Sequence, residues 1–537
     1  MGMYLNPKSP FEACRAMVST RFFVDKTRLI CDILESLEMD GQRYLCFTRP
    51  RRFGKTVMAN MVGAFFEKGV DSSEMFDRLE IGRSKYYKKY RNSRNVIYID
   101  FSQIPKDCRN YHQYIERIQD GLVEDLASLY LEFSIRRSHS AWDVLTEIFE
   151  KTNHRFIFVI DEWDAVFHMP FMTDNDTEQY VLFLKSLLKS KEYVELVYMT
   201  GILPIAKYSD GSELNMFDEY TMAGSERYSG YFGFLDGEVD RLYQIYQDTA
   251  RNPKITREDL SQWYDGYVTA SGSRLYNPRS IVSALRDNQL GSYWTNSGTY
   301  DPIFRYMKEN VEGVQDDLVI MVSGGRIEAR IQEYAATAKE LNTKDQIYSA
   351  MVVYGLLTYE DGEVFIPNRE LMKKFDDLLL EHESLGYVNR LAKESSKMLK
   401  ATLSGDTKTM ADILKYVHDT ESPIFSYNNE IELSAVVNLV YLAARDKYRV
   451  EREDKAGEGY VDFIFYPHRK GADAIILELK VGASAEEAIR QIKDRKYMLR
   501  FKGKLGEEER YTGRILAVGI AYDKKTKEHF CKVEVLQ

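Results

Sequence analysis

The sequence predicts an α/β protein with a parallel sheet near its N-terminus, a helical middle and a second α/β domain near its C-terminus. Three observations support this prediction. The 537 residues are too many for one hydrophobic core. Between residues 44 and 201, continuous apolar runs alternate with amphipathic stretches. A similar alternation returns after residue 425, beyond a long helical stretch.

The expected N-terminal sheet consists of apolar runs without polar alternation. These runs occupy residues 44–49, 95–102, 156–164 and 194–201. Such runs are typical of parallel strands buried on both faces. Amphipathic stretches separate them, and we expect helices at residues 56–69, 111–148 and 180–190.

The rest of the chain is expected to form three further parts. Residues 228–300 are helical and aromatic and predict a lid or adaptor. Residues 345–375 follow a helix-hairpin-helix order, which indicates a small winged-helix-like unit. The last part has expected helices at residues 430–445 and 485–500 and strands at residues 460–467, 474–481, 514–523 and 531–537. We therefore place the domains at residues 1–225, 226–375, 376–425 and 426–537, with residues 376–425 as a helical connector.

Composition limits the partner and the compartment. The formal net charge of -10 argues against a wholly basic nucleic-acid coat, but a local basic groove stays open. The five cysteines are odd in number, widely spaced and without a CxxC pair, which favours reduced thiols in a cytoplasmic protein. We find no signal-peptide pattern and no apolar run long enough to span a bilayer, so we expect no membrane partner.

A phosphate-binding motif follows the first apolar run. Backbone N–H groups and the positive end of the next helix would hold the phosphates of ATP at this loop. Lys55 would reach the β and γ phosphates, and Thr56 would ligate Mg²⁺. Arg49 stands where the generic motif has its first glycine, so the motif is degenerate. The candidate nucleotide-binding residues here are Arg51, Arg52, Phe53, Gly54, Lys55 and Thr56.

Acidic residues end a later strand, as they do opposite the P-loop in ATPases. Asp161 would hold Mg²⁺, and Glu162 would act as the catalytic residue that orients or deprotonates the attacking water. Asp164 is a further acid nearby, and Thr200 ends the next strand, where it could sense the γ-phosphate. The alternative is purely structural: Gly54 to Thr56 would open a helix, and the acids would favour a helix N-terminus.

A second set of polar residues lies in the C-terminal domain. Glu478 and Lys480 share one face of an expected strand, and Asp462 on the preceding strand could join them. Such carboxylates would bind Mg²⁺ or Mn²⁺, and Lys480 would orient the attacking water, as phosphodiester hydrolysis requires. Glu430 could supply a further metal ligand. Two side chains of the next helix could face the site: Gln491 and Tyr497.

The short pattern in the C-terminal domain has an alternative explanation, an ion pair between Glu478 and Lys480 on an exposed strand. Longer blocks in one order favour the site. They are RPRRFGKT, VIDEWDAVF, YMTGILPI, NMFDEY, WYDGY, SYWTNSGTY, GYVDFIFYP, IILELK and AIRQIKDRKY. This order resembles the bacterial and archaeal AAA-ATPase-like family whose members carry a C-terminal PD-(D/E)XK nuclease-superfamily domain.

The resemblance implies a P-loop nucleoside triphosphatase core of the additional-strand type. It also implies helical and winged-helix-like regions and a restriction-endonuclease-like domain. Arg49 matches the family's own form of the P-loop. We therefore expect ATP binding and hydrolysis with Mg²⁺, and a Mg²⁺- or Mn²⁺-dependent nuclease whose cleavage of nucleic acid is gated by ATP.

Several points about the partners stay open at this stage. We expect DNA as substrate rather than RNA. The alternative function is a regulatory or signalling ATPase whose C-terminal domain binds nucleic acid or protein without cutting it. A homo-oligomer that shares ATP sites and a protein trigger are further partners to consider.

Overall fold

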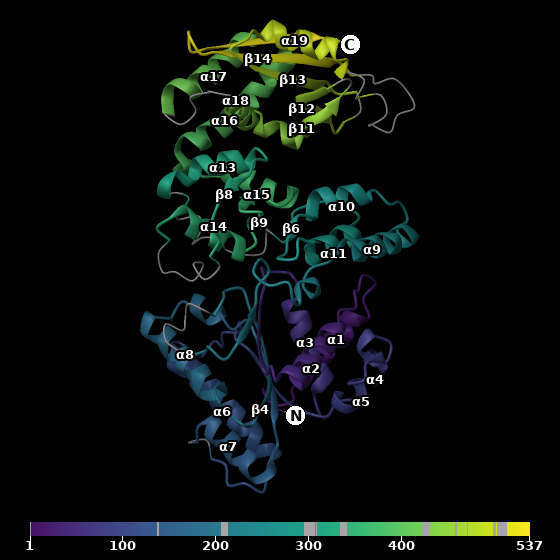
Figure 1. Cartoon of the computed structure of the whole chain (residues 1–537), viewed down its shortest axis with the longest axis vertical. Coiled ribbons are helices and arrows are strands. Elements are labelled where there is room, and N and C mark those ends of the chain that lie inside the picture. The colour runs from purple at the N-terminus through teal and green to yellow at the C-terminus, as the bar shows by residue number, and fades with distance from the viewer. Residues whose placement is uncertain are drawn as a thin grey trace. The chain divides into compact units, whose positions relative to one another are not determined.

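The computed structural model describes residues 2–136, 139–205, 213–294, 307, 309–332, 341–421, 430–456, 459–469, 471–497, 501 and 513–537 (Figure 1). The chain divides into two compact units. The first comprises residues 1–303 and 328–371, and the second comprises residues 304–327 and 372–537. Within the described ranges, no helix is both long and apolar enough to cross a membrane.

The first unit is built around a five-stranded sheet. Its strands are β1 (Tyr44–Thr48), β2 (Asn95–Asp100), β3 (Phe156–Asp161), β4 (Val194–Gly201) and β5 (Asp218–Tyr220). They are ordered β2-β3-β4-β1-β5, and neighbouring strands are parallel. Strand β4 therefore lies between β1, which precedes the P-loop, and β3, which carries Asp161. This is the expected additional-strand arrangement.

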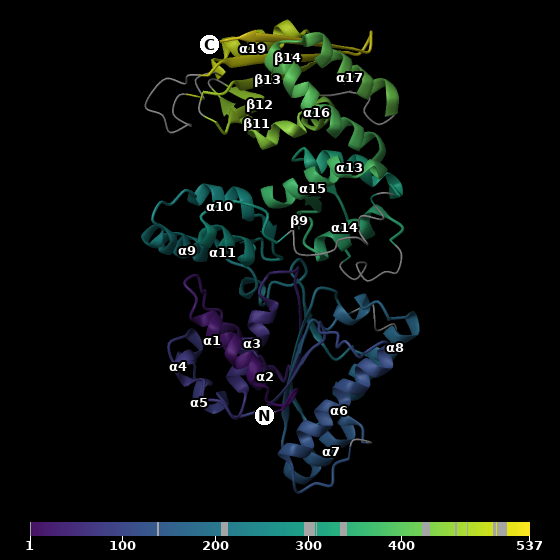
Figure 2. The same cartoon turned by 180° about the vertical axis from the view of Figure 1, so that it is seen from behind.

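Helices cover both faces of this sheet, as predicted (Figures 1 and 2). One face packs against α6 (Tyr111–Leu129), α7 (Ala141–Thr152) and α8 (Asp174–Leu188). The other packs against α2 (Arg28–Asp40), α3 (Lys55–Phe66), α4 (Ser73–Phe76) and α5 (Tyr87–Tyr90), with α1 (Lys8–Val18) beside α3. Alternate strand residues enter each core: Phe158 faces the first set of helices and Val159 the second.

The prediction of continuous helix over residues 111–148 was wrong. Helix α6 begins at a side-chain cap, where Asn110 accepts a hydrogen bond from the Gln113 amide. It ends at Tyr130, which leaves the helical region with φ -113 and ψ 67. Helix α7 starts only at Ala141. Both helices place apolar residues in the same core, which favoured a single helix in the prediction, although residues 136–140 (RRSHS) contain no apolar side chain.

The remainder of the first unit contains two small substructures. Helices α9 (Asp236–Thr249), α10 (Arg257–Tyr264) and α11 (Pro278–Asp287) share one core and carry the hairpin β6 (Tyr267–Val268) and β7 (Arg274–Leu275). The expected helix-hairpin-helix order is present as α14 (Lys344–Val353), β9 (Thr358–Glu360), β10 (Glu363–Phe365) and α15 (Arg369–Glu381). Helix α15 begins in the first unit, and from Met372 onward it belongs to the second. Strand β8 (Ile327–Glu328) adds to that hairpin in the order β8-β10-β9.

The second unit contains a mixed sheet in sequential order, β11-β12-β13-β14-β15. The strands are β11 (Tyr448–Ala456), β12 (Gly459–Pro467), β13 (Ala474–Val481), β14 (Ile515–Asp523) and β15 (Glu528–Val535). Only the central pair β13 and β14 is parallel, so the chain between them must cross over, and α19 (Ala485–Asp494) lies in that crossover.

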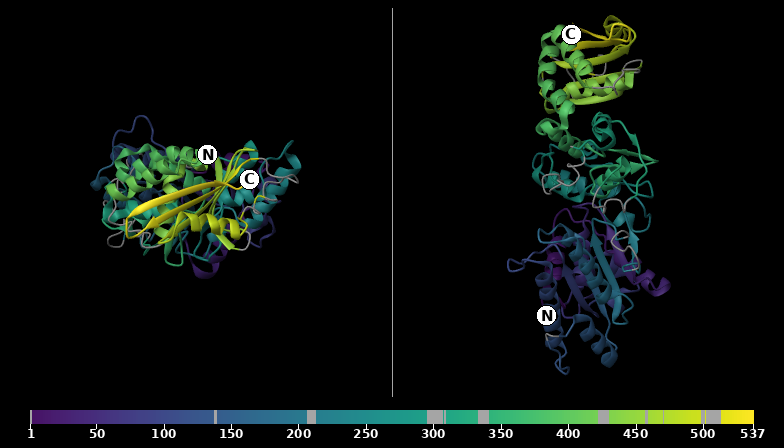
Figure 3. Two further views of the ribbon diagram at one scale, coloured as in Figure 1. Left: turned by 90° about the horizontal axis from the view of Figure 1, so that it is seen from above. Right: turned by 90° about the vertical axis from the view of Figure 1, so that its left-hand side faces the viewer.

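Helices α16 (Gly386–Ser404), α17 (Thr407–Glu421) and α18 (Glu430–Val440) accompany this sheet and are green in Figure 3, where the last strands are yellow. Helix α13 (Val314–Val322) packs against α18. Helix α19 contributes Ile489 and Ile492 to a core with Val461 and Ile476 of β12 and β13. This packing fixes α19 beside the strands that carry the second set of predicted site residues.

Candidate nucleotide and nuclease sites

The predicted P-loop joins the end of β1 to the start of α3. Gly54 caps the helix at φ 93, a left-handed conformation that glycine adopts without strain. Arg52 also has a positive φ of 69. The turn thus delivers the chain directly to Lys55, the first residue of α3, and places the positive end of the helix dipole at the loop. This is the geometry that phosphate binding requires.

Lys55 lies against its own loop. Its side chain is buried, and Nζ donates hydrogen bonds to the carbonyl oxygens of Arg49 at 2.9 Å and Pro50 at 3.1 Å. Burial lowers the pKa of the ammonium, and the negative charges of Asp164, Glu162 and Asp161 oppose that shift. A phosphate would therefore have to replace two carbonyl partners of Lys55.

Three predicted residues meet at the ends of adjacent strands. Asp161 at the end of β3 is buried and accepts a hydrogen bond from the Thr200 hydroxyl of β4. The Thr56 hydroxyl also bonds to Asp161. Burial raises the pKa of Asp161, while the hydrogen bonds from Thr200 and Thr56 lower it. The structure thus brings together the two side chains predicted to hold Mg²⁺ and the predicted sensor.

Glu162 follows directly in a left-handed conformation with φ 51. Burial raises its pKa, Lys55 lowers it, and Asp161 and Asp100 raise it further. A non-glycine residue in this region of φ is strained and is often found at functional sites. The strained turn places Glu162 near the same charges that surround Asp161.

The remaining predicted P-loop residues do not all face this cluster. Phe53 is buried and meets Tyr267 edge-on, with ring centroids 4.9 Å apart, and its carbonyl oxygen accepts a hydrogen bond from the Gly233 amide. Arg51 is half-buried and Arg52 is exposed. Phe53 therefore fixes the loop to the following substructure, and its candidate contact with nucleotide stays a prediction.

The predicted nuclease residues lie on β12 and β13. Glu478 is buried, and its Oε1 accepts a hydrogen bond from Lys480 Nζ at 3.2 Å. Asp462 Oδ2 accepts the Leu479 amide at 2.7 Å, which brings this carboxylate beside β13. Gln491 of α19 also donates to Glu478 Oε1. The structure therefore gathers Asp462, Glu478, Lys480 and Gln491 at one point.

Two family models match the chain, one over each stretch that carries a candidate site. Residues 11–209 match the family described as a predicted AAA-ATPase, and residues 433–529 match the PD-(D/E)XK nuclease superfamily. The chain joins an AAA-ATPase-like domain to a PD-(D/E)XK nuclease-superfamily domain. These matches confirm the predicted family, and they cover Lys55, Asp161, Asp462 and Glu478.

Solved structures give more distant matches. The Walker-type ATPase of Pyrococcus abyssi is 13% identical over 65% of this chain and 94% of its own, with a TM-score of 0.35. The ORC2 protein of Aeropyrum pernix, solved as ADPNP and ADP complexes, is 12% identical over 66% of this chain and 92% of its own, with a TM-score of 0.32. The search of curated proteins found no match.

The nuclease-superfamily domain contains one buried oxygen suited to a metal ion. Glu478 Oε2 is buried and has no hydrogen-bond partner among the described residues. Burial raises the pKa of Glu478 to about 7, and the charge of Asp462 contributes in the same direction. A cation would relieve both effects, so these carboxylates fit the divalent metal that the prediction assigns to them.

The third predicted metal ligand of this domain is not described. Glu430 begins α18, but its side chain lies outside the part of the chain that the structure describes. Among the described residues, no group of three or more His, Cys, Asp or Glu side chains could hold a metal. The described candidate ligands are therefore the pair Asp462 and Glu478.

The AAA-ATPase-like domain has three residues whose roles the sequence did not reveal. Asp100 ends β2 in register with Asp161 and raises the pKa of that carboxyl. Both strands end in Asp at the same sheet edge, a signal that could have identified Asp100. Asp164, considered an accessory acid, instead accepts the amides of Ile202 at 3.0 Å and Leu203 at 2.8 Å, so it holds the turn after β4.

Arg49, the third such residue, is a structural anchor of the AAA-ATPase-like domain. Its guanidinium is buried and donates through Nη1 to the carbonyl oxygens of Thr48 at 2.7 Å and Tyr220 at 2.6 Å. It also lies 4.9 Å from the centre of the Phe232 ring. The residue that replaces the first P-loop glycine thus ties the start of the loop to the end of β5.

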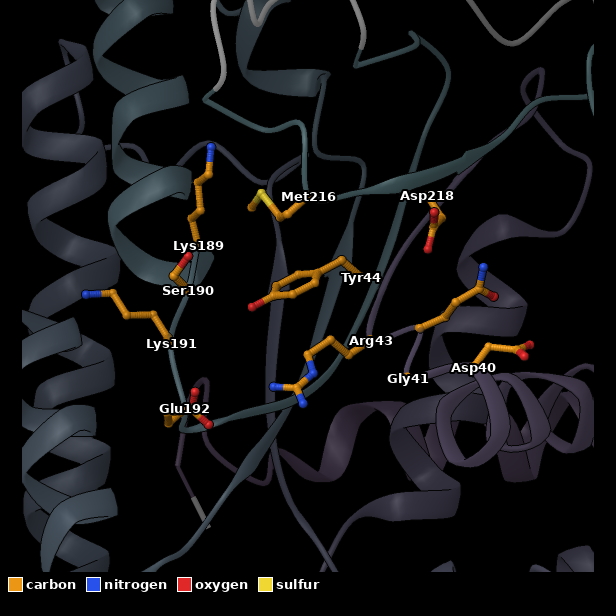
Figure 4. Close-up of a pocket in the computed structure, with 11 residues that line it drawn as sticks. Asp40, Gly41, Arg43, Tyr44, Lys189, Ser190, Lys191, Glu192, Met216 and Asp218 are labelled. Carbon is orange, nitrogen blue, oxygen red and sulfur yellow. The ribbon is translucent and has the colours of Figure 1, made fainter.

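A hollow of about 480 Å³ in the AAA-ATPase-like domain lies away from the P-loop (Figure 4). It opens beside Tyr44 and Asp218, which begin β1 and β5. The P-loop follows the opposite end of β1. No predicted site residue lines this hollow, whose lining is Asp40, Gly41, Gln42, Arg43, Tyr44, Lys189, Ser190, Lys191, Glu192, Met216 and Asp218.

Proposed function

We propose that this protein binds and hydrolyses ATP in its AAA-ATPase-like domain and cuts phosphodiester bonds of nucleic acid in its nuclease-superfamily domain. Binding of ATP gates the cleavage. The observation that carries the proposal is the presence of two separate clusters in one chain. One is Thr56, Asp161 and Thr200 beside Lys55. The other is Asp462, Glu478 and Lys480.

In the ATPase site, hydrolysis needs positioning and neutralisation of charge more than covalent chemistry. Lys55 leaves the carbonyl oxygens of Arg49 and Pro50 and binds the phosphates. Thr56 and Asp161 would hold Mg²⁺, which would neutralise phosphate charge. Glu162 accepts the proton of the attacking water. The Thr200 hydroxyl donates its one proton to Asp161 and keeps that carboxylate oriented, so it contacts the γ-phosphate only when it releases Asp161.

In the nuclease site, Asp462 and Glu478 hold a Mg²⁺ or Mn²⁺ ion, which would polarise the phosphate and acidify bound water. Glu478 must lose its proton before it can bind the cation. Lys480 then exchanges its ion pair with Glu478 for the attacking water or the developing phosphate charge. Gln491 holds the carboxylate of Glu478 in place.

The test compares labelled single- and double-stranded DNA and RNA, with Mg²⁺ or Mn²⁺, with and without ATP. We expect DNA to be cut by the native chain and by neither Asp462→Ala nor Glu478→Ala, both of which should still turn over ATP. Lys55→Ala should lose ATP turnover and the ATP dependence of cleavage. Equal loss of both activities in every variant would contradict two separate sites.

A second function has one specific observation in its favour. Lys480 Nζ lies 3.2 Å from Glu478 Oε1, so this carboxylate has one cationic partner without a metal ion. This favours a regulatory ATPase whose C-terminal domain binds nucleic acid or a protein trigger without cutting. Titration calorimetry with Mn²⁺ separates the two functions, because metal binding that disappears in Glu478→Ala supports the nuclease.

A further inference from the structure

An arginine outside the predicted site ends a line of side chains that starts at Glu478. Gln491 Nε2 contacts Glu478 Oε1 and lies 3.4 Å from the Tyr497 hydroxyl oxygen. Arg495 Nη1 donates to the same hydroxyl oxygen at 3.3 Å. Tyr497 is fully buried, whereas Arg495 is exposed. The line therefore runs from the buried carboxylate to a cation at the surface.

Tyr497 gives this cation a defined position. Arg495 is the first residue after α19. Its amide donates to the Gln491 carbonyl oxygen at 3.1 Å, and the next amide, of Lys496, donates to the Lys493 carbonyl oxygen at 3.1 Å, so the backbone here is fixed by the end of the helix. The buried phenol ring then supplies a rigid acceptor for the guanidinium. The charge of Glu478 also acts on Arg495 and contributes to its raised pKa, after the larger effects of Tyr497. The guanidinium thus lies within electrostatic reach of the site.

Arg495 differs from the neighbouring cationic side chains, which lie close to carboxylates. Lys493 pairs with Glu534, Arg490 lies 3.8 Å from Glu487, and Lys480 pairs with Glu478. No carboxylate of the described residues lies within ion-pair distance of Arg495. A guanidinium with free donors matches the paired oxygens of a phosphate group.

We propose that Arg495 binds a backbone phosphate of the nucleic acid next to the bond that is cut, and that Tyr497 and Gln491 set its distance from Glu478. The inference rests on the proposed function, since it names a substrate contact of the same site. It assigns to Arg495 a contact with the sugar-phosphate backbone, which carries no base sequence. Arg495 is therefore a substrate-binding residue, and Tyr497 is a positioning residue.

The test uses the full chain and two arginines of similar exposure at one helix. Fluorescein-labelled DNA is titrated without divalent metal, to prevent cleavage, into the native protein, Arg495→Ala and Arg490→Ala. We expect Arg495→Ala to weaken binding about tenfold and to reduce the slope of log affinity against log salt by about one. Arg490→Ala should change binding less than about twofold, because its partner Glu487 already offsets its charge.

Two further variants distinguish the loss of a phosphate contact from a change in the fold. Arg495→Lys keeps a positive charge at the end of α19 but loses the planar fork, so it should restore only part of the affinity. Tyr497→Phe removes the acceptor of Arg495 and should raise KM for cleavage more than it lowers kcat. Unchanged thermal unfolding of Arg495→Ala would show that its fold is intact, and a lowered midpoint would make Arg495→Lys the deciding variant.

The possible results distinguish the inference from the proposed function. Equal affinities of Arg495→Ala and Arg490→Ala, or no binding of DNA by the native chain, would overturn the inference. Cleavage by the native chain that is unaffected in Arg495→Ala would leave the nuclease standing without it. Binding that depends on Arg495 in a chain that never cuts would support the inference and overturn the proposed cleavage.

Discussion

At the scale of single residues, both sites depend on a buried carboxylate, and burial raises the pKa of each. Asp161 is surrounded by hydroxyl donors, whereas Glu478 has one oxygen held by Lys480 and Gln491 and another without a described partner. The hydroxyl donors oppose the rise that burial gives to the pKa of Asp161, whereas the pKa of Glu478 is raised to about 7 and its second oxygen is open to a cation. Their responses to pH and substitution should differ accordingly.

Metal binding at Glu478 should depend steeply on pH near neutrality. The pKa of about 7 means that a proton competes with the metal below that value. We expect Mn²⁺ affinity to rise about tenfold for each pH unit up to 7 and to level off above it. Calorimetry between pH 5.5 and 8.5 measures this, and Glu478→Gln should bind weakly at every pH.

The raised pKa of Glu478 also predicts how the stability of the metal-free protein depends on pH. The folded pKa of about 7 exceeds the ordinary value of 4.5, so protonation of Glu478 stabilises the fold. That contribution is complete below pH 4.5 and is lost as the pH rises through 7. The native protein should therefore lose stability as the pH rises from 4.5 through 7, and Glu478→Gln should lack this loss. A Mn²⁺ affinity that is independent of pH would contradict the assignment of Glu478 as a metal ligand.

Thr200 offers a test of the ATPase site. Thr200→Val keeps the shape of the side chain but removes the hydroxyl that bonds to Asp161. We expect ATP turnover to fall about tenfold to a hundredfold, since one hydrogen bond to a charged group contributes about 1.5–3 kcal/mol. Thr200→Ser should recover most of the rate. Equal rates for Thr200→Val and the native protein would exclude a role for the hydroxyl.

At the scale of elements, the sequence predicted best the strands that are apolar runs, and it also predicted β15, at residues 531–537 against the observed Glu528–Val535. Strands β1 to β4 and β12 to β14 are apolar runs, and each was expected close to its observed bounds. Strand β5 has only three residues, DEY, and β11 reads YRVEREDKA. Both lie at sheet edges, where one side is open and charged residues are tolerated, so their patterns carry little strand signal.

The sequence located some residues of the two candidate sites but not others. The order strand, loop, helix located Lys55, and a strand ending in acids located Asp161. The sequence alone could not place Tyr220 and Arg495, because strand order and helix packing bring them near the sites. Asp100 and the break between α6 and α7 did have sequence signals, a strand ending in Asp and the polar residues 136–140, which the prediction did not use.

Gly355, in the turn between α14 and β9, lies against Pro50 at the start of the P-loop. Gly355 has φ 77, and a Cβ atom there would lie 2.6 Å from the Cβ of Pro50. Gly362 has φ 89 with open space around it. We expect Gly362→Ala to cost about 1 kcal/mol through backbone strain alone. Gly355→Ala should cost about 2 kcal/mol or more and should also weaken ATP binding, because Pro50 must move.

Thermal unfolding and ATP titration of these two variants provide the measurement. The matched glycine separates backbone strain from displacement of the loop. Equal stability and equal ATP affinity in Gly355→Ala and Gly362→Ala would mean that the α14–β9 turn has no influence on the P-loop.

At the scale of the whole molecule, the chain consists of two compact units with separate cores and separate candidate sites. Units of this kind commonly unfold in separate transitions. A ligand that binds one folded unit stabilises that unit by mass action. The two proposed activities should therefore be visible as two ligand effects, each mainly on the unit that carries its site.

We expect calorimetry to show two transitions. A nonhydrolysable ATP analogue with Mg²⁺ should raise one midpoint, and Mn²⁺ without nucleotide should raise the other, each by a few degrees at about a hundred times the Kd. Lys55→Ala should abolish the first shift and Glu478→Gln the second. One merged transition that responds to both ligands would contradict independent unfolding.

The buried guanidinium of Arg49 has a consequence for attempts to engineer this domain toward the general P-loop motif. Replacing Arg49 with glycine would restore the first glycine of that motif, yet it would remove the donor to Thr48 and Tyr220 and leave an empty space against Phe232. In this chain the general motif would therefore be the damaging substitution.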